Sequence, residues 1–418
     1  MGLLYERALL DGTGLDADAV RRLEQQAGKA CAGLGQAPFS LHLDGPLPQA
    51  SAAQRVVVLG VGGSALGARA VHEACAGPAA LPLTVVDNID ARPLEAAWNG
   101  GDPARTAWVV VSKSGGTAET LAHCAWVRER LQGLSPAPEV HIVTGDSGPL
   151  RDLALDEGLP LHAIPAQVGG RFSVFTAAGA VPLALAGLDV QGLRDGARAA
   201  LRHATALAAG SAPAAMAGLL AAAAASGRNV VVVWAYGERL EATAEWFRQL
   251  WGESLGKQRA DGTRAGQTPV HCIGSTDQHS MQQLIIEGPR DKAVLVLAGP
   301  GQNDAAVPAA ALEPLGGQSF DAILDAMRRG TTDAMVRAGC PAATLKLDAW
   351  SERSLGALLM TLLLSTVLTA HLWDVDPYGQ PGVEEAKAAA TQLLREPDGE
   401  AARRIARTLG EGDGIRVD

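Results

Sequence analysis

Short runs of β-branched and other apolar residues alternate with amphipathic stretches along most of the chain. Continuous apolar runs of this length are typical of strands buried on both faces of a parallel sheet, with helices covering the two faces. The first half of the chain has such runs at 56–60, 83–87, 107–112 and 140–145. The pattern starts again with runs at 229–235, 270–274, 292–299 and 343–348.

The two sets of alternation predict an α/β fold with two three-layer α/β/α sandwich domains, each built on a mainly parallel sheet. A mostly helical connection at 176–226 separates the two sets. We also expect helical segments at both ends of the chain. The expected bounds are an N-terminal helical lead-in at 1–50, a first sandwich at 51–190, a helical connection with the second sandwich at 191–375, and a C-terminal helical segment at 376–418.

The segment 354–373 has no charged residue and is long enough to span a membrane. It also contains serine, threonine and histidine side chains, and nothing else in the chain resembles a second span. We therefore interpret it as a helix buried on all sides in a large core. The alanine-rich run at 212–225 receives the same interpretation, because small residues suit close helix packing.

Composition narrows the classes of partner and the compartment. The chain of 418 residues has a net charge of −10 and no lysine- or arginine-rich block, which argues against nucleic-acid and anionic-membrane binding. A small anionic ligand needs only a few local donors and is not excluded. The five cysteines form no CxxC pair, and the N-terminus lacks an apolar signal-peptide core. A reducing, cytoplasmic location is expected.

The glycine-rich turn "GVGGSA" at 60–65 follows the first strand and matches the dinucleotide pattern GxGxxG/A. Asp87, at the end of the next strand, is a plausible ribose-binding acid. The glycines could equally serve tight packing between strand and helix. This turn by itself leaves both interpretations open.

A second polar turn, "SKSGGTAET" at 112–120, follows the third strand. Ser112, Ser114 and Thr117 supply hydroxyls, the two glycines between them let backbone N–H groups turn inward, and a helix begins near Thr117. Such a group binds a phosphate dianion well. A dinucleotide fold does not need this second cradle, whereas a monophosphate held between the two turns does. The alternative is that Thr117 simply caps the helix.

Glu253 is a candidate proton acceptor on the helix predicted at 240–256. By helical phase it lies at the edge of an apolar stripe that includes Trp246 and Leu250, so we expect its carboxylate to be partly desolvated. A carboxylate in that position can move a proton. The alternative is an exposed ion pair with Lys257, four residues on.

His279 is a candidate acid–base group in "GSTDQHSMQQLIIEG". Ser275 and Gln278 have capping-box spacing, which predicts a helix at 276–287 with His279 in its first turn. A helix N-terminus disfavours imidazolium, so we expect a neutral histidine. A merely solvated histidine is the alternative.

Two further blocks carry cations and amides. Arg171 follows two glycines in "GGRFSVFTAAG" and could face a substrate oxyanion or form an ordinary ion pair. In "YGQPGVEEAK", Pro381 suits a helix start, so Lys387 returns two turns later to the side of Gln380.

These blocks, in this order, resemble the bacterial-type phosphoglucose isomerase family. The resemblance rests on "GVGGSALG", "SKSGGTAET", "GGRFSVFTAAGAVPLALAG", "WFRQLWGESLGK", "GSTDQHSMQQLIIEGP" and "YGQPGVEEAK", which span roughly residues 56–387. It implies two sugar-isomerase (SIS) domains and reversible isomerisation of glucose 6-phosphate and fructose 6-phosphate through an enediol. It implies no cofactor and no metal, and a homodimer in which the partner chain supplies the histidine.

The resemblance also assigns roles by matching position. Glu253 would move the proton between C2 and C1, His279 would assist ring opening with Lys387 beside it, and Arg171 would stabilise the enediolate. The residues that would contact the substrate are Gly63, Ser64, Ser112, Lys113, Ser114, Thr117, Gln249 and Gln380.

Gly116 departs from the family pattern, which usually has a threonine there. Losing one hydroxyl donor costs about 1 kcal/mol and would weaken phosphate binding rather than abolish it. The chain is also somewhat short for the family. Two other functions stay open: a non-catalytic SIS protein that binds sugar phosphates, and a nicotinamide dehydrogenase built on the first glycine turn.

Overall fold

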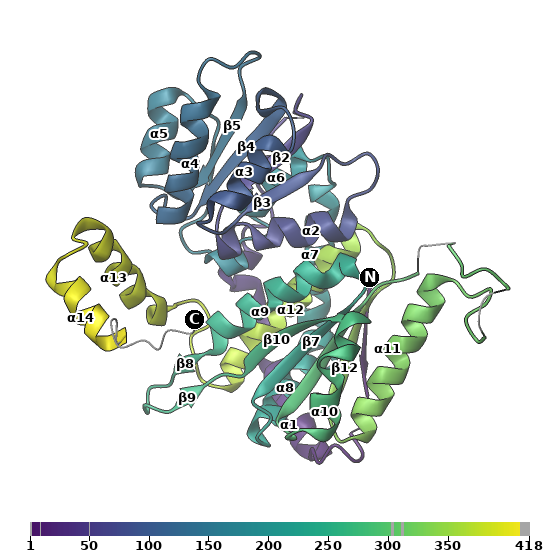
Figure 1. Ribbon diagram of the computed structural model, residues 1–418. Coiled ribbons are helices and arrows are strands. Elements are labelled where there is room, and N and C mark those ends of the chain that lie inside the picture. Colours follow the sequence, from purple (N-terminus) through teal and green to yellow (C-terminus); the bar gives the residue numbers. More distant parts are fainter. Residues whose placement is uncertain (1, 9, 50, 302–304, 311–312, 410–418) are drawn as a thin grey trace, which may run out of the picture. The chain divides into compact units, whose positions relative to one another are not determined.

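The computed structural model (Figure 1) describes residues 2–8, 10–49, 51–301, 305–310 and 313–409. The chain forms two compact units, Met1–Pro377 and Tyr378–Asp418. The first unit contains both predicted sheets. In its described part, up to residue 409, the second contains the α-helices α13 (Glu384–Arg395) and α14 (Glu400–Leu409).

The first sheet has five parallel strands in the order β3-β2-β4-β5-β6. Their bounds are β2 (Arg55–Leu59), β3 (Leu83–Val86), β4 (Thr106–Ser112), β5 (Glu139–Thr144) and β6 (Leu161–Ala163). Every residue of β2 and β4 is buried, as expected for central strands covered on both faces.

Helices cover both faces of this sheet. Side chains of α3 (Ala91–Asn99), α4 (Ala118–Leu131) and α5 (Pro149–Glu157) pack with Trp108 and its neighbours in one core. The opposite face is contacted by α2 (Leu66–Cys75) and α6 (Ala177–Leu185). This is the predicted three-layer sandwich.

The second sheet has the order β1-β12-β11-β7-β10, with β1 antiparallel and the other pairs parallel. Its strands are β1 (Leu3–Arg7), β7 (Val230–Tyr236), β10 (Thr268–Gly274), β11 (Lys292–Ala298) and β12 (Ala342–Leu347). The segment 1–50 was predicted to be helical, and this is only partly correct. It contains α1 (Ala17–Ala30), but Leu3 pairs with Leu347 at the edge of the second sheet.

Helices also cover both faces of the second sheet (Figure 1). On one face, α10 (Gln282–Glu287) and α11 (Phe320–Arg337) contribute to a core with the strands. On the other, α8 (Ala212–Ala225), α9 (Glu241–Leu255) and α12 (Glu352–Leu372) contact the sheet. The predicted fold class, two α/β/α sandwiches with mainly parallel sheets, is confirmed.

The apolar helix α12 is part of the protein core. Although it is long and apolar enough to cross a membrane, 83% of its most apolar stretch is buried inside the protein. The hydroxyls of Thr361, Ser365 and Thr369 each donate to the carbonyl four residues earlier, so none needs water. It packs closely on α7 (Val190–Leu207), where a Cβ on Gly196 would lie 1.8 Å from the Arg353 carbonyl oxygen.

Several short elements differ from expectation. The strand β6 and the hairpin β8 (Lys257–Gln258) with β9 (Arg264–Ala265) were not predicted. The helix expected at 276–287 is instead the 3-10 turn η8 (Thr276–His279) followed by α10. The domain boundaries proposed from the sequence remain predictions.

Candidate active site

Three hydroxyls gather where β4 ends. The Ser112 and Thr117 hydroxyl oxygens are 2.9 Å apart, and each lies 3.4 Å from the Ser114 hydroxyl oxygen. Thr117 immediately precedes α4, but its side chain makes no capping hydrogen bond. The helix therefore does not use this hydroxyl, which favours the phosphate cradle over the simple cap.

The backbone of this turn depends on its two glycines in different ways. Gly115 has a φ of +65°, and a Cβ there would lie 3.0 Å from the Thr144 hydroxyl oxygen, so a larger residue is strained. A Cβ on Gly116 would meet only the Ser114 carbonyl oxygen, at 3.9 Å. Gly115 is thus required by the turn, whereas Gly116 has room for a side chain.

The first glycine turn includes η3 (Gly62–Ser64). The space beside Gly60 and Gly63 is filled by other parts of the protein and is not available to a ligand. A Cβ on Gly60 would lie 2.9 Å from the Val111 carbonyl oxygen, and one on Gly63 would lie 2.3 Å from the Arg171 amide nitrogen. A dinucleotide turn needs this space for the pyrophosphate. The contacts favour a turn that supports Arg171, with the partly exposed Ser64 beside it.

Arg171 lies in η5 (Gly170–Phe172), and its side chain is only 1% exposed. Its three side-chain nitrogens contact different acceptors. Nη1 donates to Glu253 Oε2 at 3.1 Å, Nε donates to Ser254 Oγ at 2.8 Å, and Nη2 donates to the Pro377 carbonyl oxygen at 2.5 Å. Burial lowers the pKa of the Arg171 guanidinium, and Glu253 opposes that effect. A largely desolvated positive charge therefore touches the predicted base.

Glu253 lies near the end of α9, with its side chain 31% exposed. Gln249, one turn earlier, donates from Nε2 to Glu253 Oε1 at 2.9 Å, so Gln249 and Arg171 each hold one carboxylate oxygen. The Gln249 Oε1 atom is buried, and no residue that the structure describes donates to it. Lys257, the alternative partner from the sequence, lies beyond the helix in β8.

Further positive charges surround Arg171. Burial, and after it the charge of Arg171, lowers the pKa of both Lys113 and Lys257. Lys113 comes from the hydroxyl-rich turn of the first sheet, and Lys257 from the segment after α9. Lys113 and Lys257 thus add positive charge near Arg171, which itself contacts Glu253.

His279 is exposed, and its predicted local structure is wrong. The Ser275 side chain makes no capping bond, because the local hydrogen bonds run elsewhere: Asp277 accepts from the Ile273 amide, and Gln278 donates to the Tyr236 hydroxyl at 3.0 Å. His279 ends a 3-10 turn instead of beginning an α-helix. The helix-dipole argument for its neutral form therefore does not apply.

The two remaining predicted residues belong to the second unit. Gln380 precedes η9 (Pro381–Val383), and Lys387 lies on α13, where it donates to Glu384 at 3.1 Å. The helix start after Gln380 agrees with the sequence interpretation. Their position relative to Glu253 remains a prediction.

Sequence reasoning did not single out Ser254, Lys257 or the Pro377 carbonyl as parts of the site. Helical phase could have suggested Ser254, since a serine beside the candidate base on a buried helix needs a polar partner. The Pro377 carbonyl has no side-chain signal at all, because any residue offers one.

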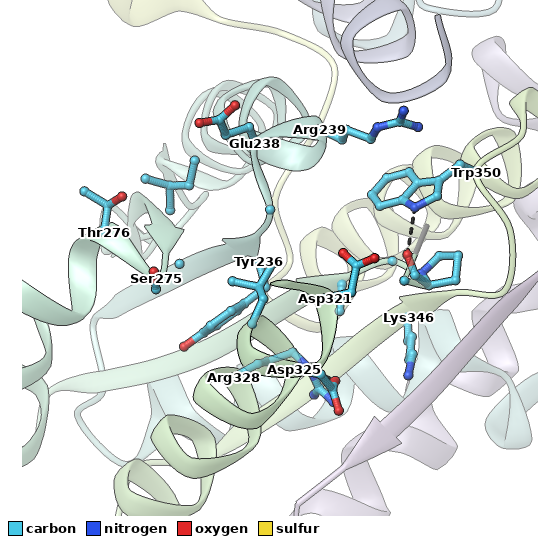
Figure 2. A pocket seen from close by; sticks show the side chains of 18 residues that line it. Tyr236, Glu238, Arg239, Ser275, Thr276, Asp321, Asp325, Arg328, Lys346 and Trp350 are labelled. Atoms are coloured by element: carbon cyan, nitrogen blue, oxygen red, sulfur yellow. Dashed lines mark hydrogen bonds and ion pairs between the residues drawn. The ribbon is translucent and has the colours of Figure 1, made fainter. Parts of the chain in front are cut away.

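The carboxyl edge of the second sheet has a different character. A cavity of about 670 Å³ lies beyond the ends of β7, β10, β11 and β12. Figure 2 shows acidic and basic side chains intermingled around it, and the Arg328 guanidinium pairs with Asp325 at 2.7 Å. None of the predicted site residues lines it. Among the residues that the structure describes, no group of three or more His, Cys, Asp or Glu side chains could hold a metal ion.

Comparison with known proteins agrees with this geometry. The family model described as phosphoglucose isomerase matches residues 49–295. A probable glucose-6-phosphate isomerase of Haloarcula marismortui is 36% identical over 99% of this chain and 95% of that protein. A glucose-6-phosphate isomerase of Thermus thermophilus is 37% identical over 81% of this chain and 83% of that protein.

Solved structures show the same architecture. A hypothetical protein from Thermus thermophilus has a TM-score of 0.76 at 32% identity, covering 92% of this chain and 89% of that one. A glucose-6-phosphate isomerase from Chlamydia trachomatis has a TM-score of 0.75 at 22% identity, over 96% and 81%, which supports the fold. The extent of these matches leads to one conclusion, which the contact between Arg171 and Glu253 supports: the chain belongs to the phosphoglucose isomerase family.

Proposed function

We propose that this protein interconverts glucose 6-phosphate and fructose 6-phosphate through an enediol, with Glu253 as the base. The observation that carries the proposal is the 3.1 Å contact between the buried Arg171 guanidinium and the Glu253 carboxylate. It joins η5, which follows the first sheet, to α9, which packs against the second sheet, and sets a proton acceptor beside a fixed positive charge.

In the proposed reaction Glu253 removes the proton from C2 of the open-chain aldose. The electron pair of that C–H bond forms the C1–C2 double bond, and the carbonyl oxygen takes the negative charge. The hydroxyl proton on O2 passes to O1, so that the negative charge lies on O2. Glu253 then returns its proton to C1, and the charge on O2 collapses to the new carbonyl at C2. The carboxylate is regenerated, so the step balances without a redox partner.

Arg171 fits this chemistry because its charge serves both stages. Before proton transfer the negative charge is on Glu253, and after transfer it is on the enediolate. A fixed guanidinium next to both stabilises each state without moving. The hydroxyls of Ser112, Ser114 and Thr117, with Lys113, would hold the phosphate, while Gly63, Ser64 and Gln249 would contact the sugar.

The rest of the assignment rests on family resemblance. His279 would handle the ring-oxygen and hydroxyl protons during ring opening, with Lys387 and Gln380 beside the sugar. His279 is exposed, which supports its use by a second chain. We therefore propose a homodimer in which the partner supplies this histidine. The proposed location is the cytoplasm. No cofactor or metal is part of the proposed mechanism.

The direct test is formation of fructose 6-phosphate from glucose 6-phosphate by the purified protein with a metal chelator present. Conversion at the same rate with and without the chelator supports the isomerase activity and a metal-independent mechanism. A folded protein that binds the sugar phosphate without converting it would instead be a binding protein.

A complementation experiment tests the shared histidine. Glu253→Gln and His279→Ala proteins are each inactive when assayed alone, and they are then mixed under conditions that exchange subunits. If the partner supplies His279, activity returns to roughly a quarter of wild type, because half of the randomly formed dimers hold one intact site each. Mixtures as inactive as the parents would place the glutamate and the histidine of each site in the same chain.

A further inference from the structure

Ser254 follows the proposed base directly in α9 and is fully buried. Alanine would be a better helix former here and would bury no polar group. The serine hydroxyl therefore needs a partner, and it accepts a 2.8 Å hydrogen bond from Arg171 Nε. Two adjacent residues of one helix thus contact the same guanidinium, one through a carboxylate and one through a hydroxyl.

The two contacts differ in how they respond to the reaction. When Glu253 takes the substrate proton it loses its charge, and its hydrogen bond from Arg171 Nη1 weakens. The Ser254 hydroxyl is neutral throughout, so its bond to Nε does not depend on the protonation of Glu253. The Pro377 carbonyl that accepts from Nη2 is also uncharged, but Pro377 is the last residue of the first unit. Ser254, in contrast, is fully buried within α9, so it is the neutral acceptor that holds Arg171 from inside the core.

We infer that Ser254 is a positioning residue, which fixes the Arg171 guanidinium while negative charge moves from Glu253 to the substrate. This inference rests on the proposed function. Without the Ser254 hydroxyl, the Arg171 guanidinium can move with the protonated Glu253 side chain or rotate toward other acceptors. The enediolate then loses a positive charge that was already aligned with it. The effect belongs to the chemical step, because Ser254 touches neither the hydroxyl-rich turn nor the sugar-contacting residues in the contacts described.

The first test is Ser254→Ala. We expect kcat to fall about 10- to 100-fold, the range for one lost hydrogen bond to a charged group, with KM for fructose 6-phosphate changed less than about threefold. Thr243→Val is the matched control, because Thr243 is a fully buried hydroxyl residue on the same helix, and its hydroxyl has no hydrogen-bond partner among the described residues. It should keep wild-type kcat. A kcat loss equal in both variants would overturn the inference.

A double-mutant cycle separates positioning from a general structural role. Lysine has no Nε–H group to bond Ser254, so Ser254→Ala should slow an Arg171→Lys enzyme by less than about twofold. A loss of the same size in both backgrounds would contradict action through Arg171. If Arg171→Lys alone leaves kcat unchanged, the proposed catalytic role of Arg171 is wrong. This outcome distinguishes a failure of the proposed function from a failure of the inference about Ser254 alone.

Ser254→Cys covers the case in which the alanine variant does not fold. Cysteine keeps the size of serine, but its sulfur is a weak acceptor. The inference then predicts a folded enzyme with reduced kcat and nearly unchanged KM. Wild-type kcat in this variant would show that the hydroxyl contact is not used.

Discussion

Four parallel strands follow a corresponding order in the two sheets, β3-β2-β4-β5 in the first and β10-β7-β11-β12 in the second, but the carboxyl edges carry different chemistry. After β4, the central strand of the first sheet, come the three clustered hydroxyls and Lys113. After β11, the central strand of the second, comes Gly299-Pro300-Gly301, and the nearby charges include the Arg328–Asp325 pair. A phosphate dianion would therefore find hydrogen-bond donors at the first edge and mixed charge at the second.

The difference shows that the sheet provides a location, whereas the loops decide the chemistry. The second sandwich instead contributes through α9, which packs against its sheet and whose last turns place Gln249, Glu253 and Ser254 near Arg171. One domain is thus proposed to bind the phosphate, and the other to supply the base. Matched substitutions at the two edges test this division.

The largest effect is expected for Glu253→Gln. The amide cannot accept the C2 proton, so kcat should fall about 10³- to 10⁴-fold while sugar-phosphate binding persists. Steady-state kinetics and calorimetric titration measure the two. Glu238→Gln removes a carboxylate at the second edge and should leave kcat at the wild-type value. Comparable losses in both variants would erase the distinction between the edges.

The hydroxyl cradle gives the next effect. Thr117→Val removes a hydroxyl but keeps the side-chain shape, and we expect KM to rise about tenfold with kcat within twofold. The same change at the second edge, Thr276→Val, should leave KM unaltered. An unchanged KM for the Thr117 variant would show that the Thr117 hydroxyl does not bind the phosphate and that the residue only precedes the helix.

A pH dependence follows from Lys113, whose pKa is lowered by burial and by Arg171. Its ammonium is present below that pKa and is lost at a less alkaline pH than for an exposed lysine. Phosphate binding should therefore weaken, and KM should increase, as pH rises through the lowered pKa of Lys113, at less alkaline pH than for an exposed lysine. Lys113→Met should abolish this rise, whereas Lys346→Met at the second edge should retain it. A persistent rise in the Lys113 variant would assign it to another group.

The smallest effect is expected for Gly116→Thr. Because a Cβ at this position meets nothing closer than 3.9 Å, the added hydroxyl can join the cradle and lower KM about threefold. Gly115→Ala is the contrasting variant, since its positive φ and crowded surroundings predict a higher KM. If Gly116→Thr raises KM instead, the turn does not bind the phosphate in the proposed way.

Most of the fold could be predicted because the buried strands are continuous apolar runs, such as 56–59, that fit few other structures. The missed strands lacked that signal. The strand β1 has the sequence "LLYER", which is partly polar because it lies at a sheet edge, and its pairing partner β12 is distant in sequence. The strand β6 has three residues, too few to show a period.

For the site, residue types and motif order predicted Arg171, Glu253 and the hydroxyl-rich turn. The structure shows the Arg171–Glu253 contact and the cluster of hydroxyls within the turn, and their joint role in one site remains a prediction. The helix start at Ser275 was wrong because Asp277 and Gln278 bond to other partners, which local spacing does not show. The partners of Arg171 come from segments far apart in the sequence, so Ser254 and Pro377 became apparent only from the tertiary contacts.

The pairing of Leu3 with Leu347 affects how the protein is made. The first sheet uses only residues between Arg55 and Ala163, so it can assemble while the ribosome is still translating the rest. The second sheet needs the N-terminal strand and β12 at the same time. At about 5–20 residues per second, the N-terminal strand waits roughly 20–70 s for its partner. During that interval the N–H and C=O groups of this segment lack their partner strand, so the segment is open to pairing with other chains until β12 is made.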